Sequence, residues 1–170
     1  SDGLAVALAA RGVGPGDRVA ILLAQHPYVL VSHFAAMKLG AVALPLFTLF
    51  GEDALRYRLS DSGASAVVTD PGNLDRVMAM QPDLPALDLV ISTGPARAPV
   101  LMLPDLVETP ARGFRPVATR AEDPAMMIYT SGTTGDPKGV LHAHRFLIGH
   151  LPCMELSQGL FPKPGDIGWT

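Results

Sequence analysis

The sequence predicts an α/β fold in which a largely parallel sheet is flanked by helices. Within residues 1–91, four short apolar segments alternate with segments whose apolar residues recur at helical spacing. Parallel strands are buried on both faces and are joined by helices, so this alternation is typical of right-handed βαβ crossovers. The chain of 170 residues is 48% hydrophobic and only 17% charged, which fits a single buried core.

The helices are predicted from apolar spacing and from residues that begin or end a helix. In the second helix, Pro27 stands at the first helical position, Leu30, Phe34 and Met37 share one face, and Gly40 follows the end. On such grounds we expect helices over residues 1–11, 26–39 and 52–62, and a fourth that begins at 70–71. The uninterrupted apolar runs between them predict strands over residues 18–24, 41–44, 66–69 and 87–91.

The second half of the chain divides into a connector and a hairpin. Residues 92–124 are rich in Pro, Arg, Ala and Gly, and only 103–107 look helical, so we interpret this stretch as a connector. Residues 125–170 should form a strand, a polar loop, a second strand through Val140, and a helix from His144 or Arg145. Pro152 should end or kink that helix, and a last strand is expected over residues 167–170.

The polar loop has the groups that a polyphosphate needs. Between Thr130 and Lys138 it carries four hydroxyls, two glycines that let backbone N–H groups approach a ligand, and one ammonium. Pro137 restricts the backbone before Lys138 and so helps to aim its side chain. The candidate phosphate ligands are Thr130, Ser131, Gly132, Thr133, Thr134, Gly135 and Lys138. A polar hairpin loop without a ligand is the plain structural alternative.

A Walker A loop is excluded by spacing and context. That motif needs Gly, four residues and then Gly-Lys-Ser/Thr at the start of a helix. Here the fifth residue after Gly132 is Pro137, Gly139 follows Lys138, and a strand comes next.

The composition limits the classes of molecule that the protein is expected to bind. The net charge of −3 and pI near 5.9 argue against nucleic acid or an anionic membrane surface, and favour a small molecule. The single Cys153 cannot form an internal disulfide, no apolar run reaches transmembrane length, and a cytoplasmic location is the simplest interpretation. The mean hydropathy of +0.28 predicts apolar surface that expects a partner, and hence self-association.

Several other residues are interpreted as structural. The three histidines at 142, 144 and 150 have no carboxylate or cysteine near them in sequence, so no metal site is predicted. Cys153 is expected to be a small buried residue. The methionines at 78, 80, 126 and 127 are expected to fill the core, and the arginines at 56, 58, 112 and 115 to be solvated.

The segment from Tyr129 to Val140, Tyr-Thr-Ser-Gly-Thr-Thr-Gly-Asp-Pro-Lys-Gly-Val, resembles the phosphate loop of the adenylate-forming (AMP-binding) superfamily. The resemblance extends to Gly16-Asp-Arg-Val-Ala-Ile, to Met37-Lys-Leu-Gly-Ala-Val and to Asp61-Ser-Gly-Ala. Pro45-Leu-Phe-Thr-Leu-Phe-Gly and the closing Pro164-Gly-Asp-Ile-Gly-Trp look most like acyl-CoA synthetases for acetyl to medium-chain acids.

The resemblance implies an ATP-dependent acid–thiol ligase that uses ATP, Mg²⁺ and CoA. A carboxylate would attack the α-phosphorus of ATP to give an acyl adenylate and pyrophosphate, and CoA would then take the acyl group. Thr133, Thr134 and Lys138 would matter most for the first step. Aryl-CoA ligases, peptide-synthetase adenylation domains and a non-catalytic nucleotide-binding module remain as alternatives.

The family's residues for magnesium, ribose, adenine and the C-terminal lysine have no counterparts in this sequence. Residues 1–170 are therefore expected to be part of the N-terminal domain of a longer protein, and to be inactive alone. Within it, we expect βα repeats over 1–91, a connector over 92–124, and the phosphate-loop hairpin with its helix over 125–170.

Overall fold

The computed structural model describes residues 1–130 and 135–157. Its strands are β1 (Arg18–Leu22), β2 (Val42–Pro45), β3 (Ala66–Thr69), β4 (Leu89–Ser92), β5 (Leu101–Met102), β6 (Pro124–Thr130) and β7 (Lys138–Ala143). Its helices are α1 (Asp2–Ala9), α2 (Pro27–Lys38), α3 (Glu52–Ser62), α4 (Pro71–Met80), the 3-10 turn η1 (Gln81–Asp83), α5 (Leu103–Val107) and α6 (Phe146–Ser157).

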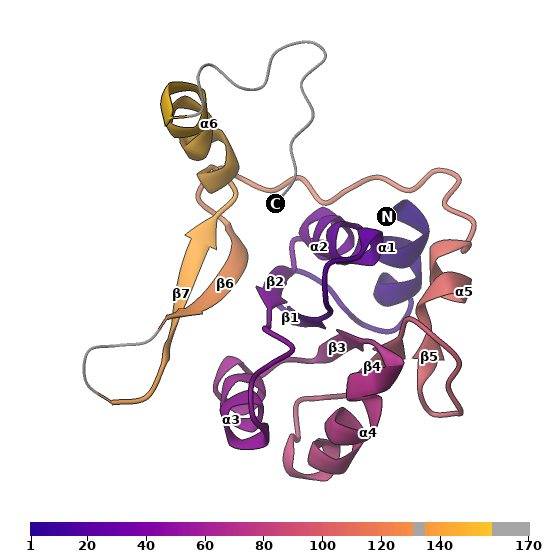
Figure 1. Ribbon diagram of the computed structural model, residues 1–170. Coiled ribbons are helices and arrows are strands. Elements are labelled where there is room, and N and C mark those ends of the chain that lie inside the picture. The colour runs from indigo at the N-terminus through magenta and orange to yellow at the C-terminus, as the bar shows by residue number, and fades with distance from the viewer. Residues whose placement is uncertain (131–134, 158–170) are drawn as a thin grey trace.

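The strands form one seven-stranded sheet in the order β5-β4-β3-β1-β2-β6-β7 (Figure 1). Neighbouring strands are parallel, except that β6 and β7 form an antiparallel hairpin. Each of β1, β3 and β4 is buried along nearly its whole length, as uninterrupted apolar runs predict. The predicted fold class, a largely parallel sheet flanked by helices, is confirmed.

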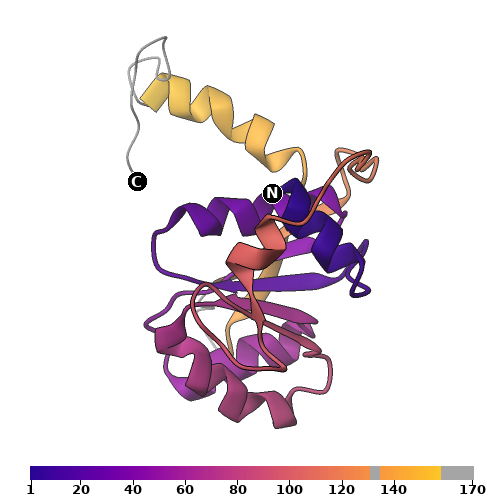
Figure 2. The ribbon, with the colours of Figure 1, turned by 90° about the vertical axis from the view of Figure 1, so that its right-hand side faces the viewer.

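Helices cover both faces of the sheet and enclose two apolar clusters (Figures 1 and 2). On one face, α1, α2 and α5 contribute residues such as Leu4, Ala35 and Leu103. On the other face, α3 and α4 contribute residues such as Leu55 and Val77. The sheet is therefore the middle layer of three.

Capping residues set where the helices begin and end. Asp70 accepts a hydrogen bond from the backbone N–H of Asn73, 3.0 Å away, at the start of α4. Helix α3 ends at Ser62 and is capped by Gly63, whose φ of +59° is left-handed and suits glycine. The guanidinium of Arg18 in β1 donates to the carbonyls of Ser62 and Gly63, at 2.6 and 2.5 Å. The end of α3 is thus fixed to the start of β1.

Several details differ from the sequence-based expectations. The connector contains β5, a two-residue strand that pairs with β4 and that the sequence did not reveal. Pro152 lies inside α6 and does not end it. Cys153 is exposed, so the prediction that it is buried is wrong. The strand expected over residues 167–170 lies outside the described residues.

The side chains of β7 and α6 leave a large apolar surface uncovered. No residue of α6 is buried, and Figure 2 shows this helix extending away from the sheet layers. The exposed apolar side chains of the two elements are Val140, Leu141, Leu147, Ile148, Leu151, Met154 and Leu156, and we call them the outer apolar surface. None of the helices in the described part of the chain is both long and apolar enough to cross a membrane.

Candidate functional site: the β6–β7 hairpin

The hairpin brings the two ends of the candidate phosphate loop together. Thr130, the last residue of β6, is paired in register with Lys138, the first residue of β7. Both side chains are exposed. Gly135 has a φ of +88°, in the region that favours glycine. The two strands predicted on either side of the loop are therefore present, and Thr130 and Lys138 lie opposite each other where the strands enter and leave it.

Four of the seven candidate ligands cannot be placed. Ser131, Gly132, Thr133 and Thr134 lie outside the described residues, so their predicted contacts with phosphate remain predictions.

The segment from Thr130 to Lys138 carries two charged side chains, those of Asp136 and Lys138. Lys138 forms no ion pair with any side chain in residues 1–130 or 135–157, whereas Lys38 is paired with Asp2. An unpaired, exposed ammonium beside a hydroxyl can form charge-assisted hydrogen bonds with phosphate oxygens. Thr130 and Lys138 thus place one hydroxyl and one ammonium group at the same end of the hairpin.

The loop end of the hairpin packs against helix α3. The hydroxyl of Tyr129 donates a hydrogen bond to Asp61 Oδ2, 2.5 Å away. The Tyr129 ring also meets the ring of Tyr57 edge-on, with centroids 6.3 Å apart. Partial burial raises the pKa of Tyr129 well above its usual value, and the hydrogen bond to Asp61 raises this pKa further. The hydroxyl therefore keeps its proton.

Arg58 also belongs to this contact, so the prediction that it is a solvated charge is wrong. Its side chain is buried, and it donates to the carbonyl of Ala54 at 2.6 Å. Its guanidinium carbon lies 4.0 Å from the centroid of the Phe50 ring and 5.6 Å from that of Tyr129. Arg58 therefore joins the loop after β2 to the loop end of the hairpin through cation–π contacts.

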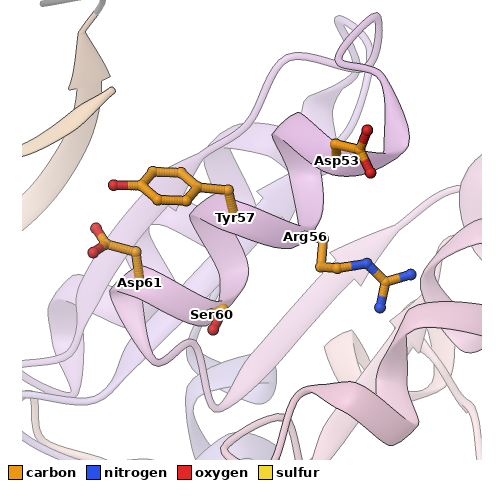
Figure 3. A pocket seen from close by; sticks show the side chains of 5 residues that line it. All are labelled: Asp53, Arg56, Tyr57, Ser60 and Asp61. Carbon is orange, nitrogen blue, oxygen red and sulfur yellow. The ribbon is translucent and has the colours of Figure 1, made fainter. Parts of the chain in front are cut away.

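A groove of about 460 Å³ runs along α3 beside the hairpin (Figure 3). Its lining residues share one face of the helix: Asp53, Arg56, Tyr57, Ser60 and Asp61. Arg56 is already paired with Glu52 and Asp83. The charge of the groove is therefore set mainly by its two lining carboxylates, Asp53 and Asp61. The groove is therefore a poor site for an anion.

The described part of the chain has no cluster of side chains that could bind a metal ion. Residues 1–130 and 135–157 contain no group of three or more His, Cys, Asp or Glu side chains that could hold an ion. The ring of His142 packs instead against Phe146, and His150 contacts the carbonyl of that same residue. No described residue is assigned to magnesium.

Comparison with known proteins gives the same family throughout. Over 137 residues the chain is 38% identical to a 4-hydroxybenzoate–CoA/benzoate–CoA ligase of Rhodopseudomonas palustris, covering 81% of this chain and 25% of the relative. It is 34% identical over 182 aligned residues to an acetyl-coenzyme A synthetase of Emericella nidulans, covering 94% of this chain and 27% of the relative. The chain thus spans about a quarter of the length of these curated relatives.

The fold is also similar to that of a CoA ligase of known structure. The crystal structure of the anthranilate CoA ligase AuaEII in complex with anthranoyl-AMP superposes with a TM-score of 0.84 at 26% identity, over 89% of this chain and 29% of that one. The family model described as AMP-binding enzyme matches residues 1–162. The chain therefore belongs to the AMP-binding enzyme family.

Proposed function

We propose that the chain is part of the N-terminal domain of an ATP-dependent acyl-CoA synthetase, in which the β6–β7 loop holds the β- and γ-phosphates of ATP. The pairing of Thr130 with an exposed and unpaired Lys138, at the mouth of a loop rich in donors, carries this proposal. Family membership supports the use of ATP and CoA.

The chemistry asked of the loop belongs to the first half-reaction. A carboxylate oxygen bonds to the α-phosphorus of ATP, and the bond from that phosphorus to the bridging oxygen breaks, so that pyrophosphate leaves. Lys138 and the hydroxyls would stabilise the charge that develops on the departing pyrophosphate, and would hold it in line. Magnesium, when bound, would neutralise part of the same charge. The CoA thiolate then attacks the acyl carbonyl and displaces AMP.

The full set of proposed phosphate ligands is Thr130, Ser131, Gly132, Thr133, Thr134, Gly135 and Lys138, of which Thr133, Thr134 and Lys138 are proposed to be catalytic. We further propose a cytoplasmic location, supported by the single cysteine and by the need for ATP and CoA.

An aryl-CoA ligase is the second candidate. It is favoured by the 38% identity to a benzoate–CoA ligase, although the alignment to acetyl-CoA synthetase covers more of the chain. The test is pyrophosphate–ATP exchange by the full-length natural protein with acetate, a medium-chain fatty acid, benzoate or an amino acid. Exchange with the aliphatic acids supports the proposal, and exchange with benzoate alone supports the second candidate. ATP binding without exchange would indicate a non-catalytic nucleotide-binding module.

We expect the 170-residue chain to be inactive when purified by itself. One lysine and a set of neutral donors cannot offset the roughly four negative charges of ATP without a positioned magnesium ion. The measurement is carboxylate-dependent exchange of labelled pyrophosphate into ATP, with the Lys138→Ala chain as background. Exchange above that background would contradict the expectation.

We also expect this chain to self-associate. The outer apolar surface is exposed, and β7 is the last strand of the sheet that residues 1–130 and 135–157 form, so both are available to a second copy of the chain. Sedimentation velocity should show a mass that rises with concentration, and Leu147→Asp with Leu151→Asp should reduce it. A monomer at all concentrations would contradict this.

A further inference from the structure

The Tyr129 ring lies across the hairpin at a position where the opposite strand has no side chain. Tyr129 is paired in register with Gly139, one step from the pair of Thr130 and Lys138. A Cβ atom built on Gly139 would be 3.2 Å from Tyr129 Cζ and 3.0 Å from the sulfur of Met127. The glycine thus leaves room for the ring to contact β7 directly beneath the loop mouth.

The same tyrosine ties the hairpin to a helix that is itself anchored. Its hydroxyl is bonded to Asp61, next to the last residue of α3. That end of the helix is held by the hydrogen bonds from Arg18 to the carbonyls of Ser62 and Gly63. A rigid connection therefore runs from β1, through the end of α3, to the strand that leads into the loop.

This connection adds to the contact between β6 and the rest of the sheet. Strand β6 is in register with β2 only at Ala43 and Met126, near the start of the hairpin. Tyr129 lies three residues further along, about 10 Å away at the rise of a strand. The hydrogen bond from Tyr129 to Asp61 therefore holds the hairpin at a point one residue from the Thr130–Lys138 pair.

We propose that Asp61, Tyr129 and Gly139 form a latch, which we call the hairpin latch, that positions the Thr130–Lys138 pair for the phosphates of ATP. The inference rests on the proposed function. All three are positioning residues, since none is assigned a contact with substrate. They affect the reaction only by setting the direction in which the two strands hold the loop.

The test uses the full-length natural protein and measures the two half-reactions separately. Tyr129→Phe removes the hydroxyl and keeps the ring, whereas Asp61→Ala removes the acceptor. Each should lower kcat/KM for ATP in pyrophosphate exchange by about tenfold, in line with a lost hydrogen bond to a charged group. Thioester formation from preformed acyl adenylate should stay unchanged. The double variant should be no worse than the poorer single one, because both lose the same contact.

Two further variants separate positioning from charge and from general damage. Asp61→Asn keeps an oxygen that can accept from Tyr129, so it should retain most activity, while a role for charge alone would make it resemble Asp61→Ala. Tyr57→Phe is the matched control, because its hydroxyl forms no hydrogen bond with residues 1–130 or 135–157 and its ring is kept. Gly139→Ala should show the same half-reaction split as Tyr129→Phe, because its methyl group displaces the ring.

Lys138→Ala, measured alongside, distinguishes the two levels of failure. If it leaves pyrophosphate exchange unchanged, the phosphate-loop assignment itself is wrong. If it slows exchange but Tyr129→Phe does not, only the latch is wrong. The latch would also be overturned if its variants slowed both half-reactions equally. The same holds if the loss of activity were accompanied by a lower urea midpoint of unfolding.

Discussion

Lys138→Ala in the full-length natural protein should slow adenylate formation by about 100-fold, the scale seen when a single donor to a developing negative charge is removed. The ammonium is exposed at the loop mouth and forms no ion pair within residues 1–130 and 135–157, so its charge is available to the phosphates. Thioester formation from preformed acyl adenylate should be spared, because pyrophosphate has already left at that stage.

Lys38→Ala is the control for this result. It removes the same charge from a lysine that is paired with Asp2 on the α1–α2 side of the sheet. Both half-reactions should stay unchanged in this variant. Lys138→Arg should keep part of the activity, since the charge remains and only its geometry changes. If Lys138→Ala damaged both half-reactions equally, the lysine would have a structural role.

Leu44→Ala should lower the free energy of unfolding of the 170-residue chain by about 2–5 kcal/mol, the usual cost of a large cavity in a core. Leu44 is fully buried in β2, within the cluster that α3 and α4 cover. Urea unfolding followed by far-UV circular dichroism, at a concentration low enough to prevent self-association, measures the change.

Leu49→Ala is the matched control, because the same atoms are removed from a side chain that is 79% exposed. Its effect should stay within about 0.5 kcal/mol, as for most surface substitutions. If both variants unfolded at the same urea concentration, Leu44 would not belong to a packed core.

The sequence predicts the first half of the fold well because local signals and burial agree there. The apolar runs at 66–69 and the Gly63 cap both match the structure, and β1 and β4 differ from prediction only at their ends. Strand β5 was missed because two residues carry no recognisable alternation, and pairing with β4 is what makes them a strand.

The candidate site is only partly visible in the sequence. The loop and its donors are contiguous, so Thr130, Gly135 and Lys138 could be named directly. Asp61 and Tyr129 are 68 positions apart, and no local pattern pairs them. Arg58 looks like an ordinary helical charge until its position on the buried face of α3, between Phe50 and Tyr129, is known.

The most direct test of the loop's role is protection of Lys138 from an amine-acylating reagent in the full-length natural protein, followed by peptide mapping. Lys138 is exposed, so it should react readily without nucleotide. We expect ATP with magnesium, or pyrophosphate with magnesium, to slow its labelling, and AMP to leave it unchanged, while Lys38 reacts equally in all samples. Labelling of Lys138 at the same rate with saturating ATP as without it would contradict the assignment of this loop to the phosphates.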